Sequence, residues 1–392
     1  MISRNLRHLR VFLAVAETGS VTRAAAACLV SQPAVTQALR KLEREIGARL
    51  FERTRQGLFA TQRARLLAAR ANRAFGFLDP ALARVSPRLR LTATAAQLTA
   101  LIAVREAENF TLAARRLGLA QPTIHRAVTQ LEQAAARPLF ERTSFGMAAT
   151  QQTRALAQAV QLAFAELDQA EADIAELEGG EVGRLVVGAL PLSRSAILPK
   201  ALIAFRKQRP TQQITVIDGP YGELLGGLRR GDIDVIVGAL RAPAPIGDIR
   251  QEPLFDDHLS ILAAPRHPLT GRTRLSRADL AGWSWVVPRL GTPARDQFDA
   301  CFAGAEPPRS IIETGSILLM REILCQSDHL GCISSAQAEA EVSRGLLARL
   351  DVGTSWAGRP IGLTCRRSWA PTRAQSLLLE LIREAAAEVA LP

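Results

Sequence analysis

The stretch AAAACLVSQPAVTQALRKLEREIGARLFERT, residues 24–54, determines how the N-terminal part of the chain folds. A run of alanines predicts a short helix with small side chains, and a tight turn follows it. Ser31 is a favoured N-cap residue, and Pro33 lies in the first turn of the next helix. Apolar residues at helical spacing extend that helix to about Ile46, where Gly47 ends it. The stretch therefore predicts two helices joined by a turn.

A short hairpin is predicted after these helices and a further helix before them. Leu50-Phe51 is typical of a buried strand, residues 53–57 form a turn with two cations, and residues 58–61 return as a second strand. Upstream, apolar residues from Leu9 to Ala16 recur at the spacing of an amphipathic helix. A helix-turn-helix followed by a hairpin is the arrangement of a winged helix-turn-helix domain.

The same pattern occurs a second time in the chain. Residues 12–61 and 101–150 align without a gap at an offset of 89 residues, and 19 of the 50 aligned positions are identical. Both segments carry Gln-Pro, Leu-Glu and Leu-Phe-Glu-Arg-Thr at equivalent places. A period of this length that occurs only twice indicates a duplicated domain, because a solenoid needs three or more units.

Positive charge is concentrated in the two repeated segments. The whole chain has a formal net charge of +12. Residues 1–65 hold 12 Arg and Lys against 4 Asp and Glu, and residues 88–154 hold 9 against 4. An arginine-rich proteome is an alternative source of the positive charge. It would make every surface basic, so it does not explain why the charge is concentrated in the two repeated segments. A polyanionic partner is indicated, with nucleic acid favoured over an anionic membrane.

The polar face of the helix after Ser31 carries short and amide side chains that read base edges, together with cations that contact phosphates. Taken alone, such a face also suits a core helix with one solvated side. The hairpin arginines, the basic charge and the duplication favour DNA binding. The DNA contacts predicted for the first copy are Ser31, Gln32, Pro33, Ala34, Thr36, Gln37, Arg40, Lys41, Arg53 and Arg55.

The second copy keeps the frame of the first but loses some of its contacts. Ala120 replaces the N-cap serine, which costs about 1 kcal/mol. Thr129 and Gln130 replace two cations of the first copy. The first copy is therefore predicted to make the main contacts with DNA. The second copy either binds DNA more weakly or serves as a dimerisation or spacing unit. The DNA contacts predicted for the second copy are Gln121, Pro122, Thr123, His125, Arg126 and Arg142.

Residues 24–54 closely resemble the DNA-binding signature of LysR-type transcriptional regulators. The shared pattern is Ala-Ala, Ser-Gln-Pro-Ala, Leu-Glu and then Gly-x-x-Leu-Phe-x-Arg. The resemblance implies a sequence-specific regulator that binds double-stranded promoter DNA, acts on the transcription machinery and responds to a small-molecule effector. Members of this family normally carry one such domain and are typically tetramers. Two domains per chain would supply the same number of DNA-binding domains in a dimer.

A long helix is predicted after the second copy, over residues 151–178. Its apolar residues alternate spacings of four and three over about three heptads, which indicates a surface for pairing with another helix. The resemblance implies a linker helix that joins two chains antiparallel into a homo-oligomer; packing onto its own domain is the alternative. The first copy has a shortened equivalent, which Pro80 is expected to break. Whether that helix packs on the second helix or on a partner is left open.

From Arg184 onward, strands and helices alternate, which predicts an α/β domain with a mainly parallel sheet. Two crossings between lobes, the phrase G-D-I-D-V at 231–235 and H-P-L at 267–269 resemble the effector domain of the same regulators, which is like periplasmic binding proteins. The predicted fold is thus multidomain: tandem winged helix-turn-helix domains, a linker helix and a two-lobed α/β effector domain. The predicted boundaries are 1–64 and 89–150 for the winged helices, 65–88 for a short helix and linker, 151–180 for the dimerisation helix, and 181–392 for the effector domain, with lobe 1 at 181–257 and 358–392 and lobe 2 at 258–357.

Ligands of open α/β sheets bind beyond the carboxyl ends of the strands, in the crevice between lobes. Arg194 and Arg241 suit a carboxylate or phosphate, so an anionic or polar effector is expected. The effector contacts predicted from the strand ends are Ser193, Arg194, Gly219, Tyr221, Ala239, Arg241, Gly291, Thr292, Ser316 and Ile333.

Enzyme chemistry is not indicated. The chain has no nucleophile elbow, no P-loop and no G-x-G-x-x-G, and its five cysteines lack zinc-ligand spacing, so no catalytic residue, metal or cofactor is predicted. The sparse cysteines, the lack of a signal peptide and the lack of an apolar span predict a cytoplasmic protein without a membrane partner. Two rival functions are a metabolite-binding α/β protein whose helical repeats serve only oligomerisation, and a nonspecific architectural DNA binder.

Overall fold

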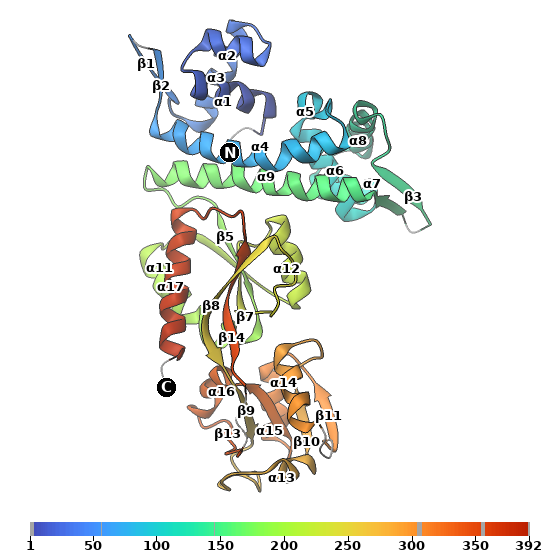
Figure 1. The fold of residues 1–392 in the computed structure, drawn as a ribbon, viewed down its shortest axis with the longest axis vertical. Coiled ribbons are helices and arrows are strands. Elements are labelled where there is room, and N and C mark those ends of the chain that lie inside the picture. The colour runs from blue at the N-terminus through green and yellow to red at the C-terminus, as the bar shows by residue number, and fades with distance from the viewer. Residues whose placement is uncertain (1–3, 56, 145, 304–307, 354–356, 391–392) are drawn as a thin grey trace. The chain divides into compact units, whose positions relative to one another are not determined.

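The computed structural model describes residues 4–55, 57–144, 146–303, 308–353 and 357–390 (Figure 1). The chain forms two compact units. The N-terminal unit comprises Met1–Gly183 with Arg230–Asp232, and the C-terminal unit comprises Arg184–Arg229 with Ile233–Pro392. Within the described residues no helix is long and apolar enough to cross a membrane.

The first repeated segment folds as a winged helix-turn-helix. Its helices are α1 (Leu6–Thr18), α2 (Val21–Cys28) and α3 (Gln32–Ile46), and its hairpin pairs β1 (Phe51–Thr54) with β2 (Gly57–Ala60). Side-chain oxygens of Asn5, Ser20 and Ser31 cap the three helices, which explains where each of them begins. The predicted domain is present, and Gly47 ends α3 in the left-handed conformation at φ 77°.

The second repeated segment folds as the same domain. It contains α6 (Ala95–Ala107), α7 (Phe110–Leu117), α8 (Gln121–Ala135), β3 (Phe140–Thr143) and β4 (Gly146–Ala149). The Leu50 amide donates to Glu43 Oε1 at 2.9 Å, and its counterpart Leu139 donates to Glu132 Oε1 at 2.8 Å. This hydrogen bond, which ties the hairpin to the third helix, is therefore kept in both copies.

Each winged helix continues into a long helix. These are α4 (Gln62–Val85) and α9 (Gln151–Glu176), and the short α5 (Leu89–Thr92) follows α4. The predicted break at Pro80 is wrong, because α4 runs through Pro80 to Val85. A proline inside a helix costs about 3 kcal/mol. Leu78, Leu82 and Val85 are all buried, and burial of such side chains contributes about 1.5–3 kcal/mol each, which offsets that cost.

Helices α4 and α9 pack against each other and share one apolar core with both winged helices. The seam predicted on α9, including Leu156, Val160 and Leu167, is buried in this core. The partner of the seam is thus α4 of the same chain, one of the possibilities that the sequence left open, whereas the family resemblance implied a second chain. The duplication supplies this partner, because it provides two copies of the long helix within one chain.

The C-terminal unit contains two five-stranded sheets of mixed direction, so the prediction of a mainly parallel sheet is wrong: β8, β9, β13 and β14 add antiparallel pairs. The first sheet has the order β6-β5-β7-β14-β8, with β14 antiparallel to both of its neighbours, and helices α11 and α17 cover the face that carries Leu185 and Val187. Helix α12 covers the opposite face, which carries Val186. The elements are β5 (Arg184–Ala189), β6 (Gln213–Asp218), β7 (Val235–Ala239), β8 (Ile249–Asp257), β14 (Arg359–Arg366), α10 (Pro191–Ser195), α11 (Leu198–Gln208), α12 (Tyr221–Arg230) and α17 (Arg373–Ala390).

The second sheet has the order β11-β10-β12-β9-β13. The chain enters it after Asp257 and returns to the first sheet at Arg359, so it crosses twice between two lobes. Helices α13 and α14 pack on one face, and α15 and α16 on the other. The elements are β9 (Leu259–Ala263), β10 (Ser284–Val287), β11 (Ser310–Glu313), β12 (Leu330–Ser334), β13 (Ala348–Arg349), α13 (Arg277–Ala281), α14 (Pro293–Phe302), α15 (Ile317–Cys325) and α16 (Ser335–Val342).

Candidate DNA-binding surface and effector cavity

The polar face of α3 is open to solvent. Val35, Leu39 and Leu42 are buried against the rest of the domain, which turns the opposite face outward. Ser31 caps the helix by accepting from the Ala34 amide at 3.4 Å, and the Gln32 side-chain amide donates to Thr22 Oγ1 at 3.2 Å. A surface hollow of about 580 Å³ lies on this face and is lined by Val21, Gln32, Pro33, Thr36, Gln37, Arg40, Lys41 and Arg44.

The cations predicted to contact DNA are exposed in the first winged helix. Arg40 and Lys41 lie on α3, and Arg53 and Arg55 lie on the hairpin strand and the turn that follows it. In the described part of the chain none of these four forms an ion pair with a carboxylate. Their charge is therefore available to phosphate groups.

The outward residues of α8 differ from those of α3. Gln121, Thr123 and Arg126 are exposed, and so are Pro122 and Arg142 among the other predicted contacts. The His125 ring packs on Phe110 with ring centroids 5.2 Å apart. No side chain caps α8 at Ala120, as the substitution of the N-cap serine predicts.

Two further cations of the second copy were missed in the sequence analysis. Arg115 and Arg116 lie in the last turn of α7 and are exposed. Their counterparts in α2 are Ala26 and Ala27. The alignment of the two copies was the signal that would have found them, because it sets these arginines opposite alanines. In the second copy part of the positive charge is thus on α7, the helix that precedes α8.

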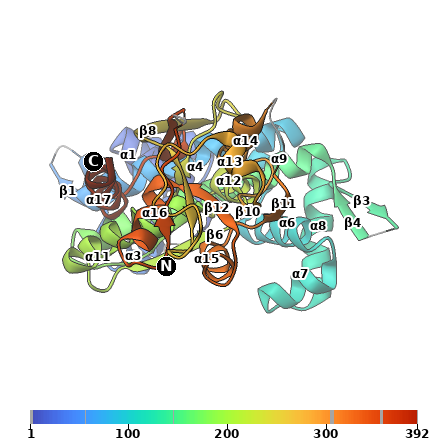
Figure 2. The same ribbon diagram turned by 90° about the horizontal axis from the view of Figure 1, so that it is seen from below.

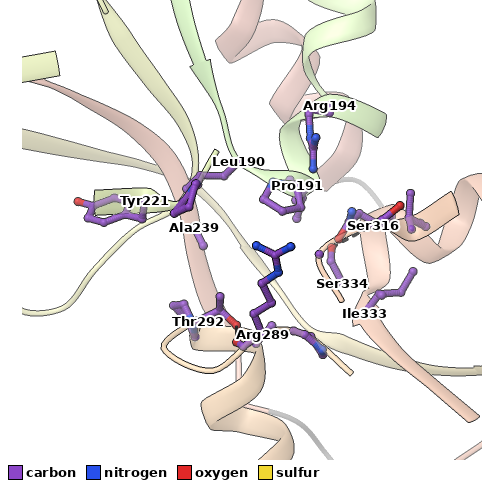
Figure 3. A pocket seen from close by; sticks show the side chains of 18 of the residues that line it. Leu190, Pro191, Arg194, Tyr221, Ala239, Arg289, Thr292, Ser316, Ile333 and Ser334 are labelled. Atoms are coloured by element: carbon purple, nitrogen blue, oxygen red, sulfur yellow. Dashed lines mark hydrogen bonds between the residues drawn. The ribbon is translucent and has the colours of Figure 1, made fainter. Parts of the chain in front are cut away.

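A cavity of about 950 Å³ lies between the two sheets of the C-terminal unit. It is built from the segments that follow the carboxyl ends of the strands of both sheets, where the sequence predicted an effector site (Figure 3). Nine of the ten predicted effector contacts line it: Arg194, Gly219, Tyr221, Ala239, Arg241, Gly291, Thr292, Ser316 and Ile333.

Ser193 is the predicted effector contact that does not line the cavity. Its side chain is fully buried, and its hydroxyl donates to the Leu190 carbonyl at 2.8 Å. The short helix α10 begins directly after Leu190, and its first turn directs Ser193 into the protein. Leu190, Pro191, Arg194 and Ser195 line the cavity from the same segment.

Four arginines line the cavity, and two of them have carboxylate partners. Arg194 pairs with Asp218 at 2.9 Å, and Arg359 pairs with the buried Asp257 at 2.7 Å. Arg241 lies over the Tyr221 ring at 4.4 Å, and its Nη1 atom is buried without a hydrogen-bond partner among the described residues. Burial lowers the pKa of the Arg241 guanidinium and raises that of the Tyr221 hydroxyl.

Arg289 is a lining residue that was not among the predicted contacts. It follows β10, and its side chain extends across the cavity toward Pro191 (Figure 3). It forms no ion pair within the ranges that the structure describes. Among the described residues, neither Arg241 nor Arg289 forms an ion pair with a carboxylate, in contrast to Arg194 and Arg359.

Two helices begin at the cavity wall. Thr292 caps α14 by accepting from the Arg295 amide at 3.3 Å, and Ser316 caps α15 by accepting from the Leu319 amide at 3.2 Å. The amino-terminal ends of helices favour negative charge. Two of the predicted contacts, Thr292 and Ser316, therefore line the cavity at the amino-terminal ends of helices.

Comparison with known proteins assigns both units to one family. The model for "Bacterial regulatory helix-turn-helix protein, lysR family" matches twice, at residues 6–65 and 95–154, and the model for "LysR substrate binding domain" matches residues 178–387. Among solved structures, a full-length variant of OxyR from Pseudomonas aeruginosa has a TM-score of 0.55 at 22% identity, and CbnR has 0.51 at 24%. Each of these two matches covers 74% of this chain and 98% of the other protein's chain, and both matches support the fold.

Two curated relatives differ in how much of this chain they match. The HTH-type transcriptional regulator GalR of Pseudomonas putida is 35% identical over 393 residues, which cover 98% of either chain. The HTH-type transcriptional regulator PcaQ of Agrobacterium fabrum is 30% identical over 297 residues, which cover 74% of this chain and 94% of its own. The match to the first relative thus spans both repeats, whereas the match to the second leaves about a quarter of this chain uncovered. The chain belongs to the LysR family of transcriptional regulators, which are DNA-binding proteins with an effector-binding domain and not enzymes.

Proposed function

We propose that this regulator binds promoter DNA mainly through α3 and the β1–β2 hairpin, and that an anionic small molecule in the C-terminal cavity controls it. The protein would act on chromosomal DNA in the cytoplasm, contact the transcription machinery and work as an oligomer. The observation that supports DNA binding most strongly is a helix face with side-chain amides beside four exposed cations, none of which pairs with a carboxylate of the described residues.

The side chains suggest which residues contact bases and which contact phosphates. Gln32 and Gln37 are suited to base edges, and Arg40, Lys41 and Arg53 to phosphates. In the second copy, Gln121 and Arg126 offer base contacts, with fewer phosphate contacts on α8 itself. We expect the first copy to contribute more to the affinity and both copies to contribute to the position of the protein on DNA.

The chemical class of the effector follows from the cavity. Arg241 and Arg289 offer two guanidinium groups for a carboxylate or a phosphate, and the ends of α14 and α15 add favourable dipoles. Apolar side chains such as Leu190, Ile317 and Ile361 line the rest of the cavity. An organic anion with an apolar body fits this surface. Its binding between the lobes would favour one arrangement of the lobes over another.

Binding to DNA from upstream of the protein's own gene tests the first part. Changing both Arg40 and Arg53 to Ala should weaken binding and reduce the slope of log K against log salt by about 0.9 for each lost phosphate contact. Arg344→Ala is the control, because Arg344 is an exposed arginine of the C-terminal unit outside the proposed surface. Unchanged affinity and slope would contradict the proposed surface.

The same assay separates the rival functions. A protein whose helical repeats serve only oligomerisation would not be retained on DNA at physiological salt. A nonspecific architectural binder would be retained equally by unrelated sequences at moderate salt. The regulator proposed here should prefer its upstream region over unrelated DNA by a factor of about 10³ or more.

Titration with small carboxylates and their neutral amides tests the proposed effector class. A ligand that binds the native state raises the thermal midpoint, so carboxylates of suitable shape should stabilise the protein. Arg241→Gln should weaken this binding about 10–100-fold, since hydrogen bonds to charged groups contribute about 1.5–3 kcal/mol. Arg344→Gln should leave it unchanged. Equal binding of neutral amides, or no effect of Arg241→Gln, would exclude an anion held by this arginine.

A further inference from the structure

Helices α4 and α9 are joined by a set of ion pairs at their packing surface. Arg70 pairs with Asp173 at 2.7 Å and with Glu166 at 3.0 Å, and Arg73 pairs with Glu166 at 3.0 Å. Arg63 pairs with Glu178 at 2.6 Å nearer the ends of the helices. Later residues of α4 thus meet earlier residues of α9, which shows that the two helices run antiparallel.

The charges in this interface are sorted between the two helices. All three cations come from the first copy and all three carboxylates from the second or the residues just after it. Arg70 and Glu166 are 6% and 5% exposed, so neither charge is solvated by bulk water. At the repeat offset, the counterpart of Arg70 on α9 is Ala159, and the counterpart of Glu166 on α4 is Phe77.

This sorting disfavours pairing of either helix with its own kind. In an antiparallel pair of two α9 helices, Glu166 would face Ala159 and Leu162 of the other copy and remain buried without a cation. In a pair of two α4 helices, Arg70 would face Phe77 and Arg84. A buried charge without its partner is strongly destabilising. Such complementary placement of charge is how helix pairs select one partner and reject another.

The connection between the two copies is compatible with pairing inside one chain. Because α4 and α9 are antiparallel, the end of α4 lies near the beginning of α9. Residues 86–94 connect α4 to α6, and α5 within this connection contacts both α4 and α8. The second winged helix therefore begins where the first long helix ends. Figures 1 and 2 both show the hairpins β1–β2 and β3–β4 at opposite ends of the helix pair.

We infer that each chain folds its two winged helices onto one α4–α9 pair and reads one DNA site made of two different half-sites in a fixed order. This inference rests on the proposed DNA binding. Two-fold dimers of identical domains read palindromic sites, because both halves meet the same recognition helix. Here Gln37 and Lys41 of α3 stand where α8 has Arg126 and Gln130. The two ends of the helix pair accordingly present different base-reading side chains.

Selection of binding sites from a random DNA library by the full-length protein tests the base readout. The expected motif has two unlike halves. Gln37→Ala should relax base preference in one half only, and Arg126→Ala in the other half only. Two half-sites of the same sequence, a motif with a single half, or equal effects of both variants on both halves would overturn the inference while leaving DNA binding intact. Failure to enrich any sequence would overturn the proposed function itself.

Cross-linking tests the pairing within one chain. Arg63→Cys combined with Glu178→Cys places two thiols on an exposed edge of the α4–α9 pair, where a short bismaleimide can bridge them. Pairing within the chain should give a cross-linked product with the denatured mass of one chain. A product with the mass of two chains, absent from variants that carry only one of the two added cysteines, would overturn this pairing in favour of an exchange of helices between chains.

Discussion

In the first winged helix the recognition helix presents Arg40 and Lys41 to solvent, whereas the second presents Thr129 and Gln130 at the same places. The cores differ much less. Leu42 and Leu131 are buried at equivalent positions, and so are Leu50 and Leu139. After a duplication, packing keeps the interior of both copies alike because each core residue touches many others. Surface residues have fewer contacts to satisfy, so their chemistry diverges.

The long helices differ in a second way. A long helix follows the hairpin of each winged helix, and the two long helices are equivalent in the repeat. In their shared interface, however, α4 carries the cations and α9 carries the carboxylates. The opposite charges of α4 and α9 hold the two copies together, whereas the different polar side chains of α3 and α8 give the two copies different DNA-facing surfaces. The comparison of the copies therefore separates residues that assemble the N-terminal unit from residues that select DNA.

The largest expected change in the free energy of unfolding comes from disrupting the ion pairs between α4 and α9. Glu166→Ala leaves Arg70 and Arg73 without one carboxylate in a buried interface, and removal of one member of a buried pair destabilises by about 3–5 kcal/mol. Asp173 still pairs with Arg70, so we expect the lower end of this range. Urea unfolding followed by helical circular dichroism measures the change.

The matched control is Glu178→Ala. Glu178 pairs with Arg63 across the same two helices, but its side chain is 60% exposed, and exposed ion pairs contribute at most about 1 kcal/mol. An equal shift for both variants would mean that the buried charges do not hold the copies together.

A smaller effect is expected from making α8 resemble α3. Thr129→Arg with Gln130→Lys restores the two cations that the second copy lacks. If both copies contact DNA, the salt slope should rise by up to about 1.8 because two phosphate contacts are added. Fluorescence anisotropy over a range of salt concentrations measures it. A slope that stays at the wild-type value would indicate that α8 does not lie against the phosphates.

The smallest effect is expected at the helix N-caps. Ser31→Ala removes the oxygen that accepts from the Ala34 amide, and should destabilise by about 1 kcal/mol. Ala120→Ser adds such an oxygen at the equivalent position, where no side chain caps α8, and should stabilise by a similar amount. The thermal midpoints of the two variants should move in opposite directions. Movement in the same direction would mean that the copies are not equivalent at this position.

Much of the fold was predicted correctly from local patterns. The duplicated winged helix-turn-helix, the following long helix and the two crossings between α/β lobes are all present. These depend on caps, periodicity and turn residues, which act over a few neighbouring positions. The break expected at Pro80 was wrong because the burial of Leu78 and Leu82 outweighs a local penalty.

The site was predicted less completely than the fold. Strand ends indicated where the cavity lies, but the direction of each side chain depends on the turn that follows the strand. Ser193 illustrates this, since one turn of α10 directs it into the core, while Arg194 beside it lines the cavity. Arg289 lies in the same strand-end segment as Thr292 but was not chosen as a contact, because the reach of its side chain across the cavity depends on a segment far away in the sequence.

The amino-acid sequence by itself determined that the chain carries two winged helices, a long helix with an apolar seam and a two-lobed α/β domain. Only the tertiary structure decided that the seam of α9 is covered by α4 of the same chain, with Arg70 between Glu166 and Asp173. The physical reason is that a periodic pattern reports which face of a helix is buried. It does not report which surface covers that face, because the partner is chosen by complementary shape and charge across a distance of many residues.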